Sequence, residues 1–376
     1  MATSKTIQPS SWINRLGFVL RSQWVMLLAL ALLILFPFIF GLLSGTSATA
    51  GPARFWQGLL INFFIMAVYA MSYDLLMGYI GILTFGQAAF FGGGAYALAL
   101  FFKHVAPGIK AAYVVTFPGL GDITDGLLLL AAFLLAVLVS ILLGLLFSLL
   151  SARVKGVYFA MITLAAAEAI YILSKASDFA QWTGADEGLQ GYAVPAFIDP
   201  TQNRLLFYFM ALAFLVILYL VLQRIVNSPT GRIFQAIREN ESRVQMIGYN
   251  PAVYRSLAFV LSSAVAGLAG ALFALWNQSV IPSTTTSSLV TINALIMTMM
   301  GGVGTLIGPV LGAGMMQIIG QFFDQWFGPR WPMVFGVVFI GLVLFLPYGI
   351  VGTWRMRKFN LKDGWKRLAN LVKVKP

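Results

Sequence analysis

Runs of about 20 apolar residues dominate this chain, and they limit what it can fold into. A helix needs about 20 such residues to cross the roughly 30 Å hydrocarbon layer of a membrane. Segments of that length occupy residues 23–43, 57–77, 82–102, 126–150, 157–175, 204–224, 255–276 and 332–351. We therefore expect an all-α, polytopic helical bundle with about eight full spans in the lipid bilayer.

The composition agrees with a membrane protein and argues against other classes. Hydrophobic residues make up 60% of the 376 residues and charged residues only 10%, whereas soluble domains carry roughly 25% charged residues. The net charge of +12 does not indicate a nucleic-acid partner, because membrane proteins collect Lys and Arg in their cytoplasmic loops. With no cysteine and the single histidine His104, we expect neither a metal site nor a cofactor.

The distribution of Lys and Arg predicts which loops stay in the cytoplasm. Residues 1–22, 151–156, 224–255 and the tail from 352 together hold 18 of the 24 basic residues. We expect all four on the cytoplasmic side, so both termini are cytoplasmic. The expected parts are an N-terminal tail (1–22), a transmembrane domain (23–351) with a polar cytoplasmic loop (227–254), and a basic tail (352–376).

One apolar segment, residues 289–322, is interrupted by the glycine-rich stretch GGVGTLIGP, Gly301–Pro309. Because the preceding loop lies outside and the last span must run inward, this segment has to begin and end outside. It is either a re-entrant hairpin that turns at GGVG or two short crossings. Irregular backbone at membrane depth survives only beside protein or a water-filled path, although glycine also serves close helix packing.

A second glycine cluster lies in MGYIGILTFGQAAFFGGGAY, Met77–Tyr96, and its three successive glycines predict a helix face almost free of side chains. The pattern MGxxGxL occurs at Met77–Leu83 and again at Met300–Leu306. The two broken elements are therefore candidates for a diverged internal repeat, and discontinuous helices recur at transport sites.

Two carboxylates fall inside predicted spans, Asp74 in the second and Glu168 in the fifth. Ionisable groups in a membrane are costly and face the bundle interior or water. Each is a path residue or a helix–helix hydrogen-bond partner, and Asp74 could instead lie close to the interface. So few titratable groups argue against a proton-driven pump. The candidate translocation path comprises Gln87, Gly92, Gly93, Gly94, Glu168, Gly301, Gly302 and Gly304.

The polar run NSPTGRIFQAIRENESRVQMIGYNP, residues 227–251, separates two of the spans. Ile233, Ile237, Val244 and Ile247 recur at helical spacing, which predicts an amphipathic helix of about four turns. The segment is too short to build a core of its own. Its apolar stripe should therefore lie on the membrane surface or in a groove of another protein.

Five stretches, in order along the chain, resemble one known family. They are MGYIGILTFGQAAFFGGGAYA near residue 80, VYFAMITLAAAE from Val157, TGADEGLQG at Thr183–Gly191, PTGRIFQAIRENESRVQMIGYNPAVYRSLAFVLSSAVAGLAGALFAL from Pro229, and GGVGTLIGPVLGA from Gly301. From about residue 60 to 350 the chain resembles the permease subunits of ABC importers for branched-chain amino acids, the LivM-like branch.

The resemblance implies a type II ABC importer permease in a bacterial inner or plasma membrane. Its partners would be a second, homologous permease subunit, two ABC ATPase subunits and a periplasmic or lipid-anchored substrate-binding protein. The chain has no G-x4-G-K-[ST] phosphate loop, so ATP chemistry would come from the ATPases and the chain is no enzyme. The implied ATPase-coupling residues are Gly231, Arg232, Ala236, Ile237, Arg238, Glu239 and Gly248, with docking through Ala236 to Glu239.

The substrate remains open between two classes. Family members often read T-G-G-P-x-G at the outer loop, whereas this chain places Ala185 and two carboxylates there. The family also includes urea and short-chain amide permeases, so branched-chain or other neutral amino acids come first and urea or amides second. A secondary transporter would not need the polar loop, and no catalytic motif indicates a membrane enzyme. The expected outer mouth consists of Thr183, Gly184, Asp186 and Glu187.

Overall fold

The computed structural model describes residues 28–41, 51–112, 116–117, 121–122, 124–154, 156–345 and 349–356. The chain divides into two compact units, residues 1–58 and 59–376. The first unit holds the apolar helix Leu28–Gly41 and the beginning of α2 (Pro52–Asp74). Within it, the rings of Phe40 and Trp56 lie 6.2 Å apart.

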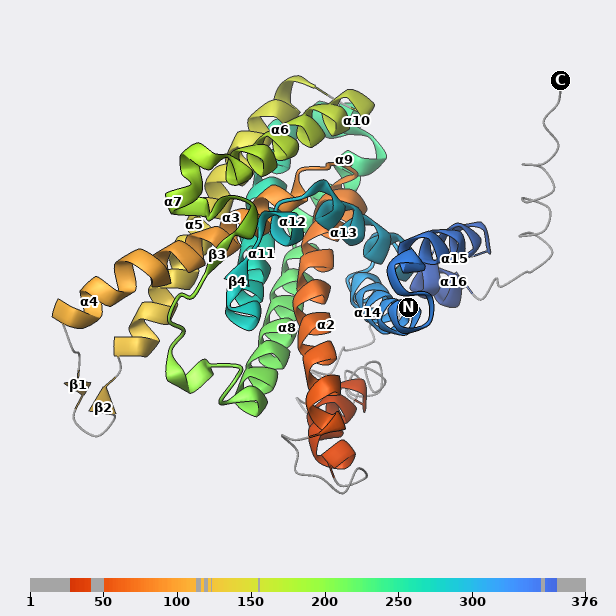
Figure 1. Cartoon of the computed structure of the whole chain (residues 1–376). Coiled ribbons are helices and arrows are strands. Elements are labelled where there is room, and N and C mark those ends of the chain that lie inside the picture. The colour runs from red at the N-terminus through yellow and green to blue at the C-terminus, as the bar shows by residue number, and fades with distance from the viewer. Residues whose placement is uncertain are drawn as a thin grey trace, which may run out of the picture. The chain divides into compact units, whose positions relative to one another are not determined.

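The second unit is helical over most of its described residues (Figure 1). After α2, its longer helices are α3 (Gln87–Leu100), α5 (Thr124–Arg153), α6 (Val157–Lys175), α8 (Arg204–Val226), α9 (Pro229–Glu239), α11 (Pro251–Asn277), α13 (Ser288–Gly301), α14 (Ile307–Phe327) and α15 (Trp331–Phe345). Shorter helices are α4 (Ala106–Ala112), α7 (Ala180–Thr183), α10 (Glu241–Met246), α12 (Pro282–Thr285) and α16 (Gly349–Met356).

Irregular helical turns and two minimal sheets join these helices. The π-helical segments are η1 (Leu75–Ile80) and η2 (Phe101–Val105), and the 3-10 turns are η3 (Ser177–Phe179), η4 (Ala185–Glu187), η5 (Ala196–Ile198) and η6 (Gly328–Arg330). Strand β1 (Thr116–Phe117) pairs antiparallel with β2 (Gly121–Asp122). Strand β3 (Leu189–Gln190) pairs antiparallel with β4 (Ser279–Val280), so the loop after α7 is fastened to the end of α11.

The predicted all-α, polytopic membrane bundle is confirmed. Within the described residues, seven helices are long and apolar enough to cross a membrane. Six of them cover the predicted spans from residue 57 to 276, and the seventh, Ile307–Thr353, runs over residues outside the described part. The expected first span, 23–43, lies partly outside the described residues, so the expected total of eight is not reached in this count.

The interrupted segment 289–322 folds as two helices that pack against one another, α13 and α14. The chain turns between them at GGVG, where Gly302 and Gly304 have φ values of +127° and +79°, a region that favours glycine. With 14 residues, α13 reaches about 21 Å. The 21 residues of α14 are long enough to cross a membrane.

The centre of the second unit is formed around α3, which packs against both α5 and α11. Side chains at this centre are fully buried, among them Phe90, Phe91 and Phe259. By contrast, α5 and α6 expose apolar side chains such as Leu134, at 61% exposure, and Tyr158, at 75%. Apolar side chains exposed in this way are suited to lipid or to another membrane subunit.

Candidate functional site

The polar loop between α8 and α11 forms two helices, α9 and α10, rather than the single four-turn helix predicted from its periodicity. Asn240 causes the break: its backbone is extended, and its side-chain oxygen accepts a hydrogen bond of 3.0 Å from the amide of Arg243. Ser228 caps α9 in the same way, through the amide of Gly231. Asparagine and serine are preferred caps because their side chains satisfy amides that the first turn leaves unpaired.

The apolar side of this loop is buried against the chain itself. Phe234, Ile237 and Val244 are each at most 6% exposed, and α9 packs against η1, α8 and α11. This corrects the expectation that the whole stripe lies on the membrane surface or in a partner's groove. Ile237 lines an open pocket beside α9 with only 6% of its surface exposed, whereas Ile247 is 69% exposed.

The two glycine-rich motifs meet beneath α9. The carboxylate of Asp74, at the end of α2, accepts a hydrogen bond of 2.7 Å from the amide of Gly304. The guanidinium of Arg238 on α9 donates to the carbonyl of Gly78. A Cβ on Gly78 would lie 2.5 Å from the amide nitrogen of Gly304, so glycine allows this close approach. The GGVG turn therefore lies at the end of the unit that carries α9.

Three successive glycines predicted to line the translocation path, Gly92, Gly93 and Gly94, lie in contacts between helices. A Cβ on Gly93 would lie 2.6 Å from Leu143 of α5, and one on Gly94 would lie 2.5 Å from the Cα of Gly267 in α11. Gly92 faces Thr286 in the same way. The expected open, side-chain-free face is thus occupied by three neighbours, and close packing explains these glycines in this conformation.

Gln87, the first residue of α3, belongs to a buried polar cluster. Its side-chain amide donates hydrogen bonds of 2.8 Å to Ser72 and 3.0 Å to Ser262, and the hydroxyl of Ser262 donates to the carbonyl of Ser72. All three side chains are fully buried. Gln87 therefore fastens three helices together in this conformation.

Glu168 lies on a different surface. It is half-buried on α6, on the same helical stripe as Tyr158, Met161 and Ile172, which are 62% to 75% exposed. A carboxylate among exposed apolar side chains would be costly against lipid. This stripe is therefore suited to a second membrane subunit or to a water-filled path.

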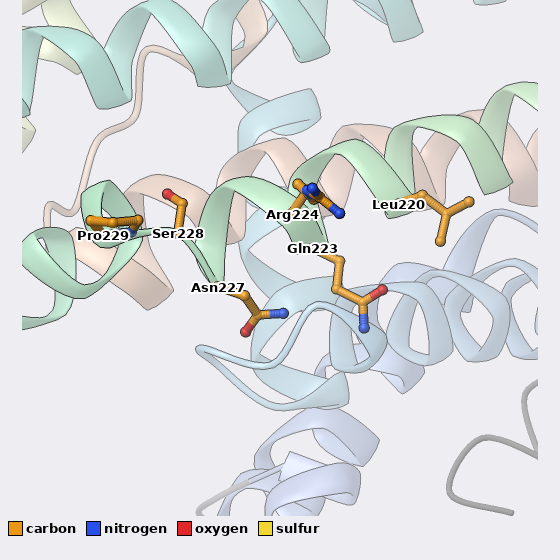
Figure 2. Close-up of a pocket in the computed structure, with 6 residues that line it drawn as sticks. All are labelled: Leu220, Gln223, Arg224, Asn227, Ser228 and Pro229. Carbon is orange, nitrogen blue, oxygen red and sulfur yellow. The ribbon is translucent and has the colours of Figure 1, made fainter. Parts of the chain in front are cut away.

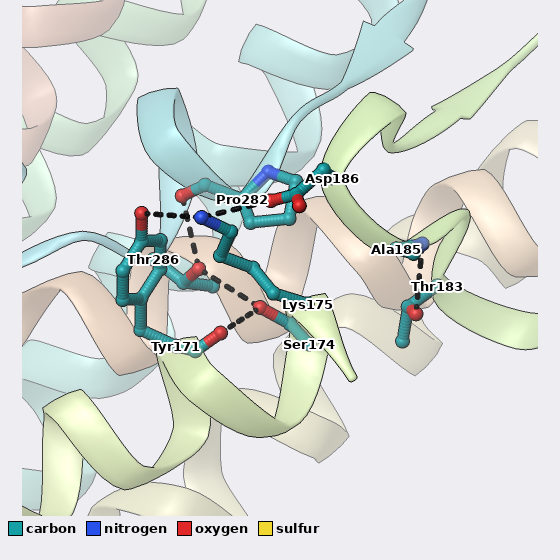
Figure 3. Close-up of polar contacts among 8 residues, drawn as sticks. All are labelled: Tyr171, Ser174, Lys175, Thr183, Ala185, Asp186, Pro282 and Thr286. Atoms are coloured by element: carbon teal, nitrogen blue, oxygen red, sulfur yellow. Dashed lines mark hydrogen bonds and ion pairs between the residues drawn. The ribbon is translucent and has the colours of Figure 1, made fainter. Parts of the chain in front are cut away.

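The residues predicted for the outer mouth lie in the loop after α6, beside polar contacts between α6 and the segment before α13 (Figure 3). Lys175, at the end of α6, forms an ion pair of 2.8 Å with Asp186 and lies over the ring of Tyr171. The hydroxyl of Ser174 lies 3.4 Å from that of Thr286. Thr183, Gly184 and Glu187 belong to the same loop, in which the amide of Ala185 donates to Thr183.

Replacing Asp186 by asparagine is expected to leave the melting temperature of the purified protein unchanged. Both side chains of its ion pair with Lys175 are solvent-exposed, at 37% and 73%, and such pairs contribute little to stability. Thermal unfolding in detergent, with the parent chain measured beside it, checks this. A fall of more than about 2 °C would mean that Asp186 does more than form a surface ion pair.

Two open pockets lie at the end of the unit that carries α9. One, of about 670 Å³, is lined by the last turn of α8 and the start of α9, including Gln223, Arg224 and Asn227 (Figure 2). The other, of about 350 Å³, lies between the end of η1, the α5–α6 turn and α9, and both Arg238 and Arg255 line it. Arg255 is paired with Glu241.

The family model for the permease component of branched-chain amino acid transport systems matches residues 55–347. The chain belongs to this family. It is a multi-pass membrane protein and a transport subunit rather than an enzyme. The described residues Asp74 to Gly304, including the α9–α10 loop and both glycine motifs, all lie within the matched region.

Curated relatives agree with this assignment. The permease is 25% identical over 327 residues to a probable branched-chain amino acid transport permease protein LivM of Methanocaldococcus jannaschii. The aligned region spans 78% of this chain and 92% of the relative. The permease is 25% identical to the high-affinity permease LivM of Escherichia coli, over 80% of this chain and 70% of the relative. It is 22% identical to BraD of Pseudomonas aeruginosa, over 78% and 93%. No solved structure matches the permease significantly.

Sequence reasoning missed two features of the permease that the structure brings forward. Asp74 was recognised as an intramembrane charge, but its contact with the second glycine motif was not expected. The sequence contains one indication that Asp74 lies near a glycine motif, because it precedes Gly78 of MGYIG by one helical turn. The exposure of Met246, at 80%, beside Ile247 was also missed, because the expected single helix hid the end of α10.

Proposed function

We propose that this permease is the membrane subunit of an ATP-driven importer that carries branched-chain or other neutral amino acids. The observation that supports this most is the α9–α10 loop, a pair of helices fixed between two spans and facing out of the bundle at one end, in a chain whose family is that of branched-chain amino acid permeases. The relatives described above are named for the same substrates.

We propose that ATP is hydrolysed by two ABC ATPase subunits, which dock on the exposed residues of the α9–α10 loop. This docking surface consists of Arg232, Ala236, Glu239, Met246, Ile247 and Gly248. The other predicted coupling residues are left out of it, because Gly231 and Ile237 are buried and the guanidinium of Arg238 is bonded to the carbonyl of Gly78. Met246 and Ile247 supply its apolar centre. Large exposed apolar side chains next to polar ones mark protein interaction sites, and aromatic or apolar anchors carry most of the binding energy in such contacts.

The second permease subunit is proposed to lie against the exposed stripe of α6. A homologous partner is supported by the similarity of this chain to a permease named LivH, at 28% identity over 173 residues. With α6 facing that partner, Glu168 would lie at the shared translocation path rather than in lipid. Gln87 and the turn Gly301 to Gly304 are retained in the proposed path as elements that open during transport.

We propose that both termini and the α9–α10 loop are cytoplasmic, in a bacterial inner membrane, and that a periplasmic or lipid-anchored binding protein delivers the substrate. The outer loop with Thr183, Gly184, Asp186 and Glu187 would then face that protein. The concentration of 18 of the 24 basic residues in the proposed cytoplasmic segments supports this orientation.

Reconstitution tests the proposed function. The permease is inserted into liposomes with its ATPases, its second permease subunit and its binding protein, and uptake of radiolabelled leucine is measured with and without ATP. We expect uptake only with ATP and binding protein. The isolated binding protein, screened by thermal shift against amino acids, urea and short-chain amides, is expected to be stabilised by neutral amino acids. Stabilisation by urea or amides alone would overturn the substrate assignment.

The orientation is testable because the chain has no natural cysteine. A single cysteine at Ser242, exposed in the α9–α10 loop, is expected to resist a membrane-impermeant maleimide in intact spheroplasts and to react after permeabilisation. A cysteine at Thr201, exposed in the loop before α8, should react in both. The reverse pattern would contradict the proposed topology.

A further inference from the structure

Asp74 is a buried carboxylate to which the proposed function assigns no role. It is 0% exposed at the junction of α2 and the π-helical segment η1. One of its oxygens accepts the 2.7 Å hydrogen bond from Gly304, and the other, Oδ2, has no hydrogen-bond partner among the described residues. Burying a carboxylate is costly unless it is paired, so its position calls for a compensating interaction.

The α9–α10 loop supplies the compensating charge. Arg238 of α9 lies on the other side of Gly78 and Gly304 from Asp74, and the two side chains form no direct ion pair. Its guanidinium donates instead to the carbonyl of Gly78, one turn after Asp74, and lies 3.2 Å from the position of a Cβ on Gly304. Gly78 and Gly304 are thus held between the two charges.

Local backbone structure makes this contact possible. Gly81, with φ of +80°, ends η1 in a left-handed conformation that favours glycine. A Cβ on Gly81 would lie 2.7 Å from Cγ of Arg238, so the stem of Arg238 crosses directly over this glycine. The carbonyls at the end of a helix lack partners within the helix, which leaves that of Gly78 free for the guanidinium.

We propose that Asp74 and Arg238 form a latch that ties the coupling helix α9 to both glycine-rich elements of the permease. Arg238 holds η1, which directly follows α2, through Gly78, and Asp74 holds the α13–α14 turn through Gly304. This inference rests on the proposed function, in which α9 receives the movement of the ATPases. Both are positioning residues: they transmit that movement to the ends of two helices and do not themselves touch substrate.

The variants Asp74→Asn and Arg238→Gln test the latch in the reconstituted complex. Asparagine keeps an oxygen that can accept from Gly304, so folding is preserved while the charge is lost. We expect both variants to retain the ATPases and their melting temperature, but to transport about tenfold less leucine per ATP hydrolysed. Arg238→Lys keeps the charge and is expected to recover part of this coupling ratio. Asp324→Asn in the last turn of α14 and Arg330→Gln in η6, both exposed, are the matched controls and should behave as the parent.

Non-additivity gives a second measure of the latch. If the two residues act as a unit, the double variant Asp74→Asn/Arg238→Gln should lose no more coupling than the worse single variant. Losses that multiply would overturn the latch. So would a parental coupling ratio in Asp74→Asn, or a loss of coupling that appears only together with a loss of assembly or melting temperature.

Hydrogen exchange separates failure of the latch from failure of the proposed function. In the isolated permease, without ATPases, the amides of residues 301–306 are expected to exchange about tenfold faster in Asp74→Ala, which cannot accept from Gly304. Unchanged exchange would overturn the latch whatever the transport data show. Absence of ATP-driven uptake by the parent complex, with faster exchange in the variant, would instead overturn the proposed function.

Discussion

Replacing Gly94 by valine is expected to remove most of the folded permease from the membrane. A Cβ at this position would lie 2.5 Å from the Cα of Gly267 and closer still to its carbonyl oxygen. Because the obstacle is backbone of α11 and not a flexible side chain, α3 and α11 would have to move apart. Extra methylenes in well-packed cores cost about 1–3 kcal/mol even where side chains yield, so we expect a larger cost from a helix displacement.

A graded series of alanine variants checks this reason. Gly94→Ala is expected to lower the melting temperature most. Gly93→Ala should have a smaller effect, since its nearest neighbour is the flexible end of Leu143. Gly126→Ala in α5, where a Cβ would meet nothing within 4 Å, is the matched control and should be neutral. Equal melting temperatures for the variants of Gly94 and Gly126 would contradict the packing role and restore the interpretation of Gly94 as part of an open path.

These glycines show how far sequence reasoning reaches in a membrane bundle. Apolar length located the spans from residue 57 to 276, because the thickness of the bilayer sets that length regardless of tertiary contacts. The break at GGVG was predicted because its glycines interrupt the apolar run of residues 289–322, but the sequence left a re-entrant hairpin and two short crossings both open. Whether a glycine lines a path or a contact depends on which helix lies opposite, and the sequence around Gly94 contains no information about Gly267.

In the α9–α10 loop, too, the sequence does not show which element lies opposite a residue. Its amphipathic periodicity predicted correctly that Ile237 and Val244 face apolar surroundings, but not that those surroundings belong to the permease itself. The break at Asn240 was missed because asparagine is compatible with both a helix interior and a cap. The latch could not be predicted, since Asp74 and Gly304 are separated by 230 residues and come together only through the packing of α2 beside α13.

The double variant Met246→Asp/Ile247→Asp is expected to abolish binding of the ATPases to the permease. The two side chains are 80% and 69% exposed at the end of α10, and the proposed docking surface has its apolar centre there. Burying two unpaired carboxylates in a protein interface is strongly unfavourable, and loss of central apolar anchors costs at least about 2 kcal/mol each. We expect a fall in affinity of at least about 100-fold.

Co-purification of the ATPases from detergent and titration by microscale thermophoresis measure this effect. Phe197→Asp, which changes an apolar side chain of 44% exposure in η5 on the proposed outer side, is the matched control and should keep parental affinity. Undiminished ATPase binding by the double variant would exclude the end of α10 from the docking surface. Because the latch variants are expected to keep the ATPases and lose coupling, while these lose the ATPases altogether, the two sets of variants separate attachment of the motor from transmission of its movement.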